Sequence, residues 1–299
     1  MQRDFITLDV FTDRPFGGNP LAVVPDGRGL DGTAMQRIAA EFNLSETVFL
    51  MPPEDPANDA ALRIFTPQLE LPFAGHPNVG AAIACAMGAG PFGKAGTRQV
   101  RFEERIGLVG LALDYDGALP RGAWLAAPAA PIVGAAVDAA LAARAAGLPE
   151  AAIRGTRHPP QRVALGPEFV IAEVADGDSF AAARPQAGAF GAAAAGLLDA
   201  ILVLYRCDGA ELQVRVFAPL AGVAEDPATG SANLALGGFL AHLAPGADAA
   251  LDLSVRQGVE IGRPSRLRVQ ASKRGDTLEP PRIHGHAVPV MEGRLRDPD

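Results

Sequence analysis

Two short stretches of this chain contain the residues best suited to chemistry, and each places a glycine at the start of a predicted helix. Gly75–Asn78 reads Gly-His-Pro-Asn and opens an apolar, alanine-rich run, and Gly230-Ser231 opens a second such run. A glycine at this position lets backbone N–H groups approach a ligand, and the positive end of a helix dipole favours an anion. Both stretches are therefore candidate binding sites for a carboxylate.

Three ionisable side chains near these stretches could move or hold a proton: Glu46, His76 and Asp226. Glu46 lies between a predicted amphipathic helix and an apolar strand, where apolar neighbours could raise its pKa and suit it to proton shuttling. Asp226 precedes Pro227, which favours an extended conformation, and it could accept a hydrogen bond from His76 or from a substrate amine. A solvated Glu46 and a turn or capping role for Asp226 stay open as structural alternatives.

The two stretches belong to a duplication of the chain. Arg63–Pro67 reads Arg-Ile-Phe-Thr-Pro and precedes the first glycine, and Arg215–Pro219 reads Arg-Val-Phe-Ala-Pro and precedes the second. A single duplication with so long a period predicts two similar domains rather than a solenoid. The two helix starts are then expected to face each other across an interdomain cleft, where small-molecule sites tend to lie.

Each half is predicted to contain strands around one helix that is apolar on every side and therefore buried. These central helices are predicted at Asn78–Met87 and Ser231–Leu243. The remaining predicted elements are a helix capped by Asp31, an exposed alanine-rich helix at Ala136–Ala146, and strands at Phe5–Phe11, Leu21–Val24, Thr47–Met51, Leu62–Thr66, Val100–Phe102, Gly107–Leu113, Arg162–Leu165, Phe169–Val174, Ala200–Tyr205, Leu212–Phe217, Leu267–Gln270 and Ile283–Met291.

The predicted domain boundary lies in a proline-rich segment. Leu119–Pro131 contains three prolines and is interpreted as the linker, so the first domain is predicted over residues 1–118 and the second over 119–282. The strand 283–291 is too short to stand alone, and we expect it to return to the first domain.

Composition excludes several classes of protein. The chain has 299 residues, 48% of them hydrophobic, and a formal net charge of −8, so it can build a sizeable core but offers no basic patch for nucleic acid. Its longest apolar stretch, Ala187–Tyr205, is interrupted by Asp199 and is predicted to be a buried helix followed by a strand rather than a membrane span. The absence of an apolar leader and the presence of only Cys85 and Cys207 predict a cytoplasmic protein with free thiols.

Three partial motifs carry little weight. Gly27–Gly32 matches G-x-G-x-x-G, but Asp31 would lie beside the pyrophosphate of a dinucleotide. His284 and His286 share a strand face without a cysteine or carboxylate to complete a metal site. Ser231 lacks the G-x-S-x-G context of a hydrolase. We therefore expect no metal, nicotinamide, flavin or pyridoxal cofactor.

Several blocks in the same order resemble the PhzF family, the phenazine biosynthesis-like isomerases of the diaminopimelate epimerase superfamily. The resemblance covers essentially the whole chain. It implies an α+β fold of two pseudo-symmetric domains, each a β-barrel-like sheet wrapped around a central helix, with the active site between them, and it implies a homodimer. The blocks are Asp9–Phe11, Gly18–Pro20, Asn43–Thr47, Phe73–Pro77 and Glu225–Ala232.

The resemblance also implies cofactor-independent proton transfer on a small amino- or hydroxy-carboxylic acid. Glu46 matches the family's catalytic acid/base, and His76 and Asp226 match residues that assist it and hold the substrate. The predicted substrate-binding residues are Gly75, Asn78, Thr229, Gly230 and Ser231.

The chain departs from the superfamily's epimerases and racemases, which use one cysteine at each glycine loop. Ala74 and Thr229 fill those two places, and neither can form a thiolate. Cys85 lies inside the first central helix, and Cys207 lies before the second motif. The sequence therefore favours an isomerase with one Glu as acid and base. The alternatives are an amino-acid epimerase or racemase and a non-catalytic metabolite-binding protein of the same fold.

Overall fold

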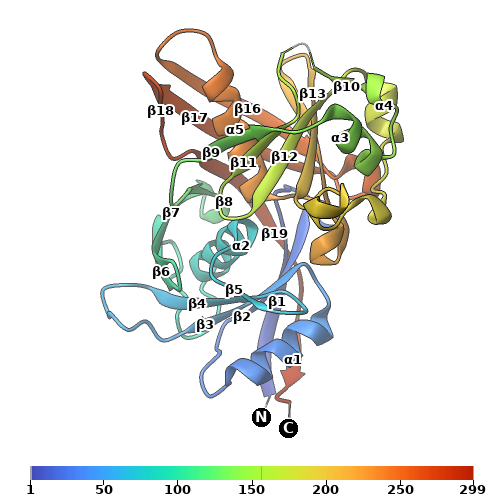
Figure 1. Cartoon of the computed structure of the whole chain (residues 1–299). Helices are drawn as coiled ribbons and strands as arrows, with labels where there is room; N and C mark the ends of the chain where they lie inside the picture. The colour runs from blue at the N-terminus through green and yellow to red at the C-terminus, as the bar shows by residue number, and fades with distance from the viewer. Residues whose placement is uncertain (1, 156, 299) are drawn as a thin grey trace. The chain divides into compact units, whose positions relative to one another are not determined.

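The computed structural model describes residues 2–155 and 157–298, which form two compact units. The first unit contains the chain up to Ala126 together with the segment from His284 onward, and the second is Ala127–Ile283. Figure 1 shows both units with their elements labelled.

The first unit is a mixed sheet whose strands follow one another around a ring. β1 pairs with β2, and the order continues through β3, β4, β6, β7 and β8, after which β19 pairs with both β8 and β1. A sheet closed in this way leaves no free edge between its first and last strands. The strands are β1 Gln2–Val10, β2 Asn19–Val24, β3 Glu46–Met51, β4 Ala60–Phe65, β5 Glu70–Leu71, β6 Gln99–Glu104, β7 Gly107–Asp116, β8 Leu119–Ala126 and β19 Arg282–Arg296.

The helix α2, Gly75–Ala86, lies inside this ring, and all of its residues are buried. It packs on β1, β2, β3, β7 and β8, and its small residues allow a close approach. A Cβ added at Gly80 would lie 2.4 Å from Leu21 Cδ2, so a side chain here would require Leu21 or the helix to shift. The fully apolar run in the sequence is thus explained by enclosure on every side.

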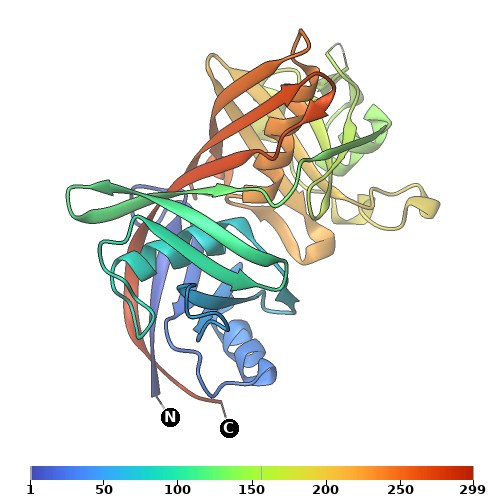
Figure 2. The same cartoon turned by 90° about the vertical axis from the view of Figure 1, so that its left-hand side faces the viewer.

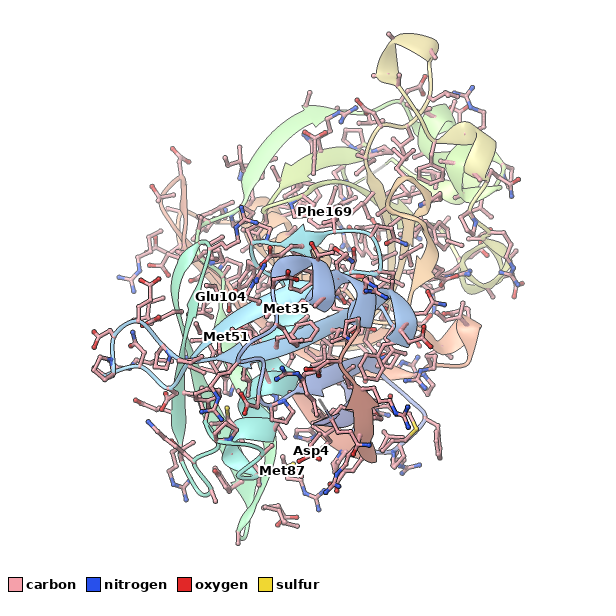
Figure 3. All side chains as sticks on the ribbon, turned by 90° about the horizontal axis from the view of Figure 1, so that it is seen from below. Asp4, Met35, Met51, Met87, Glu104 and Phe169 are labelled. Atoms are coloured by element: carbon pink, nitrogen blue, oxygen red, sulfur yellow. The ribbon has the colours of Figure 1, made fainter. Side chains whose placement is uncertain are left out.

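A second layer covers the outside of the first unit. The helix α1, Gly32–Phe42, begins after Asp31, whose carboxylate accepts a hydrogen bond from the N–H of Ala34, as the sequence predicts. Met35 on this helix packs into a core cluster with Phe49, and Met51 lies beside that cluster (Figure 3).

The second unit repeats this plan with its own sheet. The pairing order is β9, β11, β12, β13, β14, β16 and β17. The strands are β9 Ile132–Ala136, β10 Ile153–Arg154, β11 Gln161–Ala164, β12 Glu168–Val174, β13 Ile201–Asp208, β14 Glu211–Ala218, β15 Val223–Asp226, β16 Ala249–Gln257, β17 Ser265–Arg274 and β18 Thr277–Leu278.

The concave face of this sheet holds α5, Gly230–Leu243, which packs on β11, β12, β16 and β17 (Figure 2). Gly237 allows the contact with β17, because a Cβ there would lie 2.5 Å from Val269 Cγ1. The shorter helices α3, Ala139–Ala146, and α4, Gly177–Ala182, pack on the opposite face in a separate core cluster.

The duplicated sequence produces duplicated topology. β2–β3 and β12–β13 are parallel pairs, joined by α1 and α4 respectively, and β4–β6 and β14–β16 are parallel pairs joined by α2 and α5. A parallel pair requires such a crossover connection. Each unit therefore contains two strand–helix–strand crossovers, one of which carries the enclosed helix.

Three predictions about local structure were wrong. Leu119–Ala126 is not a linker but the strand β8, and its Pro120 is tolerated because it lies opposite Tyr115 at a shift in register. Ala136–Ala146 was expected to be an exposed helix, yet four alanines of α3 are buried because small side chains permit close packing. The predicted buried helix after Ala187 is replaced by short 3-10 turns at Ala187–Ala189 and Ala193–Ala195.

Glycine explains the last error, since Gly191 and Gly196 adopt φ angles of 156° and 69° that end a helix. The strand β13 that follows does form.

The predicted domain boundary falls before Leu119, whereas the first unit extends through Ala126, because β8 pairs with β7 and with β19.

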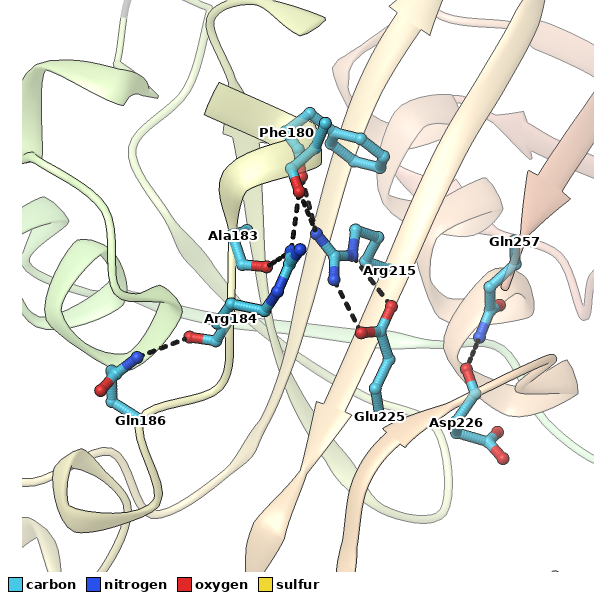
Figure 4. Close-up of polar contacts among 9 residues, drawn as sticks. Phe180, Ala183, Arg184, Gln186, Arg215, Glu225, Asp226 and Gln257 are labelled. Carbon is cyan, nitrogen blue, oxygen red and sulfur yellow. Dashed lines mark hydrogen bonds and ion pairs between the residues drawn. The ribbon is translucent and has the colours of Figure 1, made fainter. Parts of the chain in front are cut away.

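The duplicated arginines form the same ion pair in both units, at different depths. Arg215 donates to both carboxylate oxygens of Glu225 at 2.9 and 2.7 Å and also to the carbonyl of Phe180 (Figure 4). Arg63 makes the matching two bonds to Glu70 at 2.7 and 2.8 Å. The side chains are 1% and 7% exposed in the second unit, against 32% and 20% in the first.

We predict that Arg215→Met lowers the free energy of unfolding by about 3–5 kcal/mol, because it leaves the buried Glu225 without its cation. The matched variant Arg63→Met should cost about 1 kcal/mol or less, because water screens this pair. Urea denaturation followed by circular dichroism measures both values. Equal losses in the two variants would show that burial does not set the strength of this pair.

Candidate functional site

The start of α2 is a set of backbone donors without a side-chain cap. Ala74 occupies the N-cap position in an extended conformation and has no side-chain acceptor to offer. Pro77, in the third helical position, has no N–H. The N–H groups of Gly75 and His76 therefore stand at the positive end of an enclosed helix, a favourable place for a carboxylate.

Glu46 and His76 meet beside this helix start. Glu46 is the first residue of β3, which pairs in parallel with β2, and His76 is the second residue of α2. Glu46 Oε2 lies 3.3 Å from His76 Nε2, and the side chains are 16% and 6% exposed. This separation is at the long end of the hydrogen-bond range, and the two atoms do not have hydrogen-bond geometry toward each other.

The tautomer of His76 follows from its other contact. Pro20 has only a carbonyl to offer, and this carbonyl accepts a hydrogen bond from the imidazole. Because Nε2 faces Glu46, the N–H toward Pro20 is on Nδ1, and the neutral ring presents the Nε2 lone pair to the carboxyl group. Burial lowers the pKa of His76 to about 3, so the ring is neutral at physiological pH.

The start of α5 has the same backbone form, but more of the side chains around it form hydrogen bonds. Thr229 is its N-cap, and Asp226 at the end of β15 accepts a hydrogen bond from the Thr229 hydroxyl. Gln257 connects the residues of this loop by hydrogen bonds. Its Oε1 accepts hydrogen bonds from the N–H of Thr229 and from the side-chain amide of Asn233. Its Nε2 donates a hydrogen bond to the carbonyl of Asp226 at 2.8 Å (Figure 4). Ser231, in the first turn of α5, is half-buried.

The structure places each predicted site residue at one of these two helix starts. Glu46, Gly75, His76 and Asn78 lie at α2, in the first unit. Those at α5, in the second unit, are Asp226, Thr229, Gly230 and Ser231.

Sequence reasoning missed three side chains of these sites: Asn233, Gln257 and Glu104. Asn233 has the same offset from Gly230 as Asn78 has from Gly75, so the duplication could have identified it. Gln257 and Glu104 are brought to the helix starts by strand pairing, which no local motif reports.

Neither thiol occupies a helix start. Ala74 and Thr229 are the two N-cap residues, in the places where the sequence suggested that the epimerases' cysteines would lie. Cys85 is buried in the last turn of α2, and burial raises its pKa to about 12, which suppresses the thiolate. Cys207 is exposed on β13.

Residues 2–155 and 157–298 contain neither a cluster of metal-ligating side chains nor a helix suited to span a membrane. Within this part of the chain, no group of three or more His, Cys, Asp and Glu side chains is arranged to hold a metal ion. His284 and His286 lie 5.3 Å apart by ring centroids, and His284 Nε2 lies 2.8 Å from Asp114. No helix in the same described ranges is long and apolar enough to cross a membrane.

Comparison with known proteins identifies the family. The family model of phenazine biosynthesis-like proteins, PhzC-PhzF, matches residues 8–293. The chain belongs to this family.

Two curated relatives extend the match over the full chain. An uncharacterised isomerase of Mesorhizobium japonicum is 39% identical, with 98% of each chain covered. A trans-2,3-dihydro-3-hydroxyanthranilate isomerase of Pseudomonas aeruginosa is 34% identical, with 97% of this chain and 98% of the relative covered. This PhzF-family protein is therefore an isomerase.

A solved structure of a PhzF-family phenazine biosynthesis protein from Bacillus anthracis has a TM-score of 0.86, with 25% identity and 99% of each chain covered. The predicted α+β, diaminopimelate epimerase-like fold is thereby confirmed.

We predict that His76 stays neutral in the folded protein down to about pH 4, because its pKa is lowered from 6.5 to about 3. The unfolded chain then binds a proton between these values that the folded protein does not, so this residue makes stability fall as pH falls from 6.5 toward 3. Nitrogen NMR of the imidazole measures the titration, with His76→Asn assigning the signal. A midpoint near 6.5 would contradict the assignment.

Proposed function

We propose that this PhzF-type isomerase moves a proton within a small amino- or hydroxy-carboxylic acid, without a cofactor, by general acid–base catalysis at Glu46. The observation that supports the proposal most directly is the contact between Glu46 and the buried, neutral His76 beside the open N–H groups of α2. This arrangement offers a base and an electrostatic partner for the charge that develops when the base acts.

In the proposed mechanism, the substrate carboxylate accepts hydrogen bonds from the N–H groups of Gly75 and His76. Glu46 takes a proton from a carbon of the substrate, and the C–H electron pair moves into the substrate's π system. The helix dipole and the backbone donors stabilise the resulting negative charge. Glu46 then returns the proton to a different carbon, so that the double bond shifts and the substrate keeps its composition.

His76 serves as a positioning and hydrogen-bonding partner in this mechanism. Its Nδ1–H is held by Pro20, and its Nε2 faces the carboxyl group of Glu46. A neutral imidazole in this place accepts the hydrogen bond of protonated Glu46 and keeps that proton directed into the site.

We propose that Asp226, Thr229, Gly230 and Ser231 bind polar groups of the substrate, with Asp226 assisting as a hydrogen-bond acceptor. Their support is the duplicated geometry of the α5 start and its tight network through Gln257. One relative is named for trans-2,3-dihydro-3-hydroxyanthranilate, and we propose that compound as the first substrate to assay.

An amino-acid epimerase is the second candidate, because the superfamily fold hosts such enzymes. An epimerase needs a base on each face of the reacting carbon. Ala74 and Thr229 fill the two N-cap positions and supply no thiol, which favours the single-carboxylate isomerase.

We predict that Glu46→Gln lowers turnover by at least about 10²–10⁴-fold while ligand affinity changes little, because glutamine keeps the shape and hydrogen-bonding reach but cannot take a proton. Turnover and deuterium incorporation from D₂O measure the effect, and isothermal titration measures affinity.

Cys85→Ala and Cys207→Ala are the controls for this prediction, and both should retain wild-type turnover and exchange. Full exchange in Glu46→Gln, or loss of exchange in either cysteine variant, would replace the carboxylate mechanism with a thiol mechanism.

We also propose that the protein is a homodimer, as the family resemblance implies. Sedimentation equilibrium should then give about twice the chain mass of 30.8 kDa at micromolar concentration. A mass equal to one chain would contradict the proposal.

A further inference from the structure

Among the differences between the two helix starts is one polar position on a neighbouring strand: Glu104 in the first unit and Gln257 in the second. Both residues lie on the strand that runs parallel to the strand of the duplicated arginine. In the first unit Ala61 pairs with Glu103, and in the second Val214 pairs with Gln257.

The register makes these positions equivalent. Val214 immediately precedes Arg215, just as Leu62 immediately precedes Arg63. The pairing of β4 with β6 ends at Ala61 and Glu103, and continuing this register by one residue would set Leu62 opposite Glu104, as Val214 is paired with Gln257.

In the second unit, the protein itself satisfies this position. Gln257 Oε1 accepts hydrogen bonds from Asn233 at 2.7 Å and from the N–H of Thr229 at 3.2 Å, and its Nε2 donates to the carbonyl of Asp226. Asn233 in turn donates to the carbonyl of Thr229 at 2.9 Å.

In the first unit, the hydrogen-bonding groups at this position are satisfied less fully. Asn78 donates to the carbonyl of Ala74 at 3.0 Å, as Asn233 does in its own helix. Yet both oxygens of Glu104 are buried and lack a hydrogen bond of good geometry among residues 2–155 and 157–298, whereas the unpaired Oδ1 of Asn78 has its counterpart in the unpaired Oδ1 of Asn233. Burial raises the pKa of Glu104 to about 8, and hydrogen bonding by the Asn78 side chain offsets only part of this shift.

We propose that Glu104 is a specificity-determining residue that binds the ammonium group of an amino-acid substrate whose carboxylate lies at the start of α2; this rests on the function proposed above. The start of α2 and Glu104 together then offer complementary charges to a zwitterion. The N–H groups of Gly75 and His76 receive the carboxylate, and Glu104 receives the cation.

Ligand chemistry favours an ammonium over a second anion at this position. An ammonium group carries three donors, which can satisfy the two Glu104 oxygens and Asn78 Oδ1 together. Its positive charge also favours the ionised form of Glu104, and the released proton goes to solvent. A ligand with a carboxylate alone leaves these acceptors unpaired.

The test compares two probes that differ only in the ammonium group: trans-2-aminocyclohexanecarboxylate and cyclohexanecarboxylate. Isothermal titration should show that the wild-type protein binds the amino acid about 10- to 100-fold more tightly. Glu104→Gln introduces the residue type that the second unit carries at this position, so the fold should persist, and the preference should disappear. Glu104→Asp keeps the negative charge, so this variant should retain part of the preference for the ammonium probe.

Glu292→Gln, an exposed carboxylate on β19, is the matched control and should behave as the wild type. A wild-type protein without any preference for the ammonium probe, or a Glu104→Gln variant that keeps it, would overturn the proposal. Glu46→Gln separates the two hypotheses. Normal turnover in that variant would refute the proposed mechanism, whereas loss of the ammonium preference in Glu104→Gln would still support this inference.

Discussion

The enclosure of two helices within curved sheets is the constraint on which the other features of this protein depend. α2 and α5 are buried along most of their length, and each begins without a side-chain cap on its first N–H groups. Buried backbone donors without partners are costly, at about 1–3 kcal/mol each. A fold that keeps them gains a preorganised anion site, since the donors need no reorganisation when a carboxylate arrives.

The two helix starts of the duplication differ in their side chains and in how fully these are hydrogen-bonded. At α5, Gln257 and Thr229 form a closed hydrogen-bond network around Asp226. At α2, the equivalent positions hold Glu104 and Ala74, and the ion-pair contact of Glu46 with His76 lies alongside. Buried polar groups that the protein leaves unsatisfied are frequent at functional sites. The less satisfied helix start is therefore the one to which we assign the chemistry.

The repeated motifs carried most of the predictive information. Periodicity and the duplicated Arg-x-Phe motif predicted the central helices, most strands and the glycines at both helix starts, whereas the roles predicted for Glu46, His76 and Asp226 also rested on the family resemblance. Prediction failed where tertiary contacts override local signals: β8 accommodates Pro120 at a shift in register, and α3 buries alanines that look exposed in sequence. Glu104 and Gln257 were not found, because only the pairing of distant strands brings them to the helices.

The most direct test of the account is a crystal structure of Glu46→Gln with the substrate on which wild-type turnover is found. The account predicts a substrate carboxylate within about 2.7–3.2 Å of the N–H groups of Gly75 and His76, and a reacting carbon next to the substituted side chain at position 46. A substrate bound away from the start of α2, or with its reacting carbon out of reach of position 46, would contradict it.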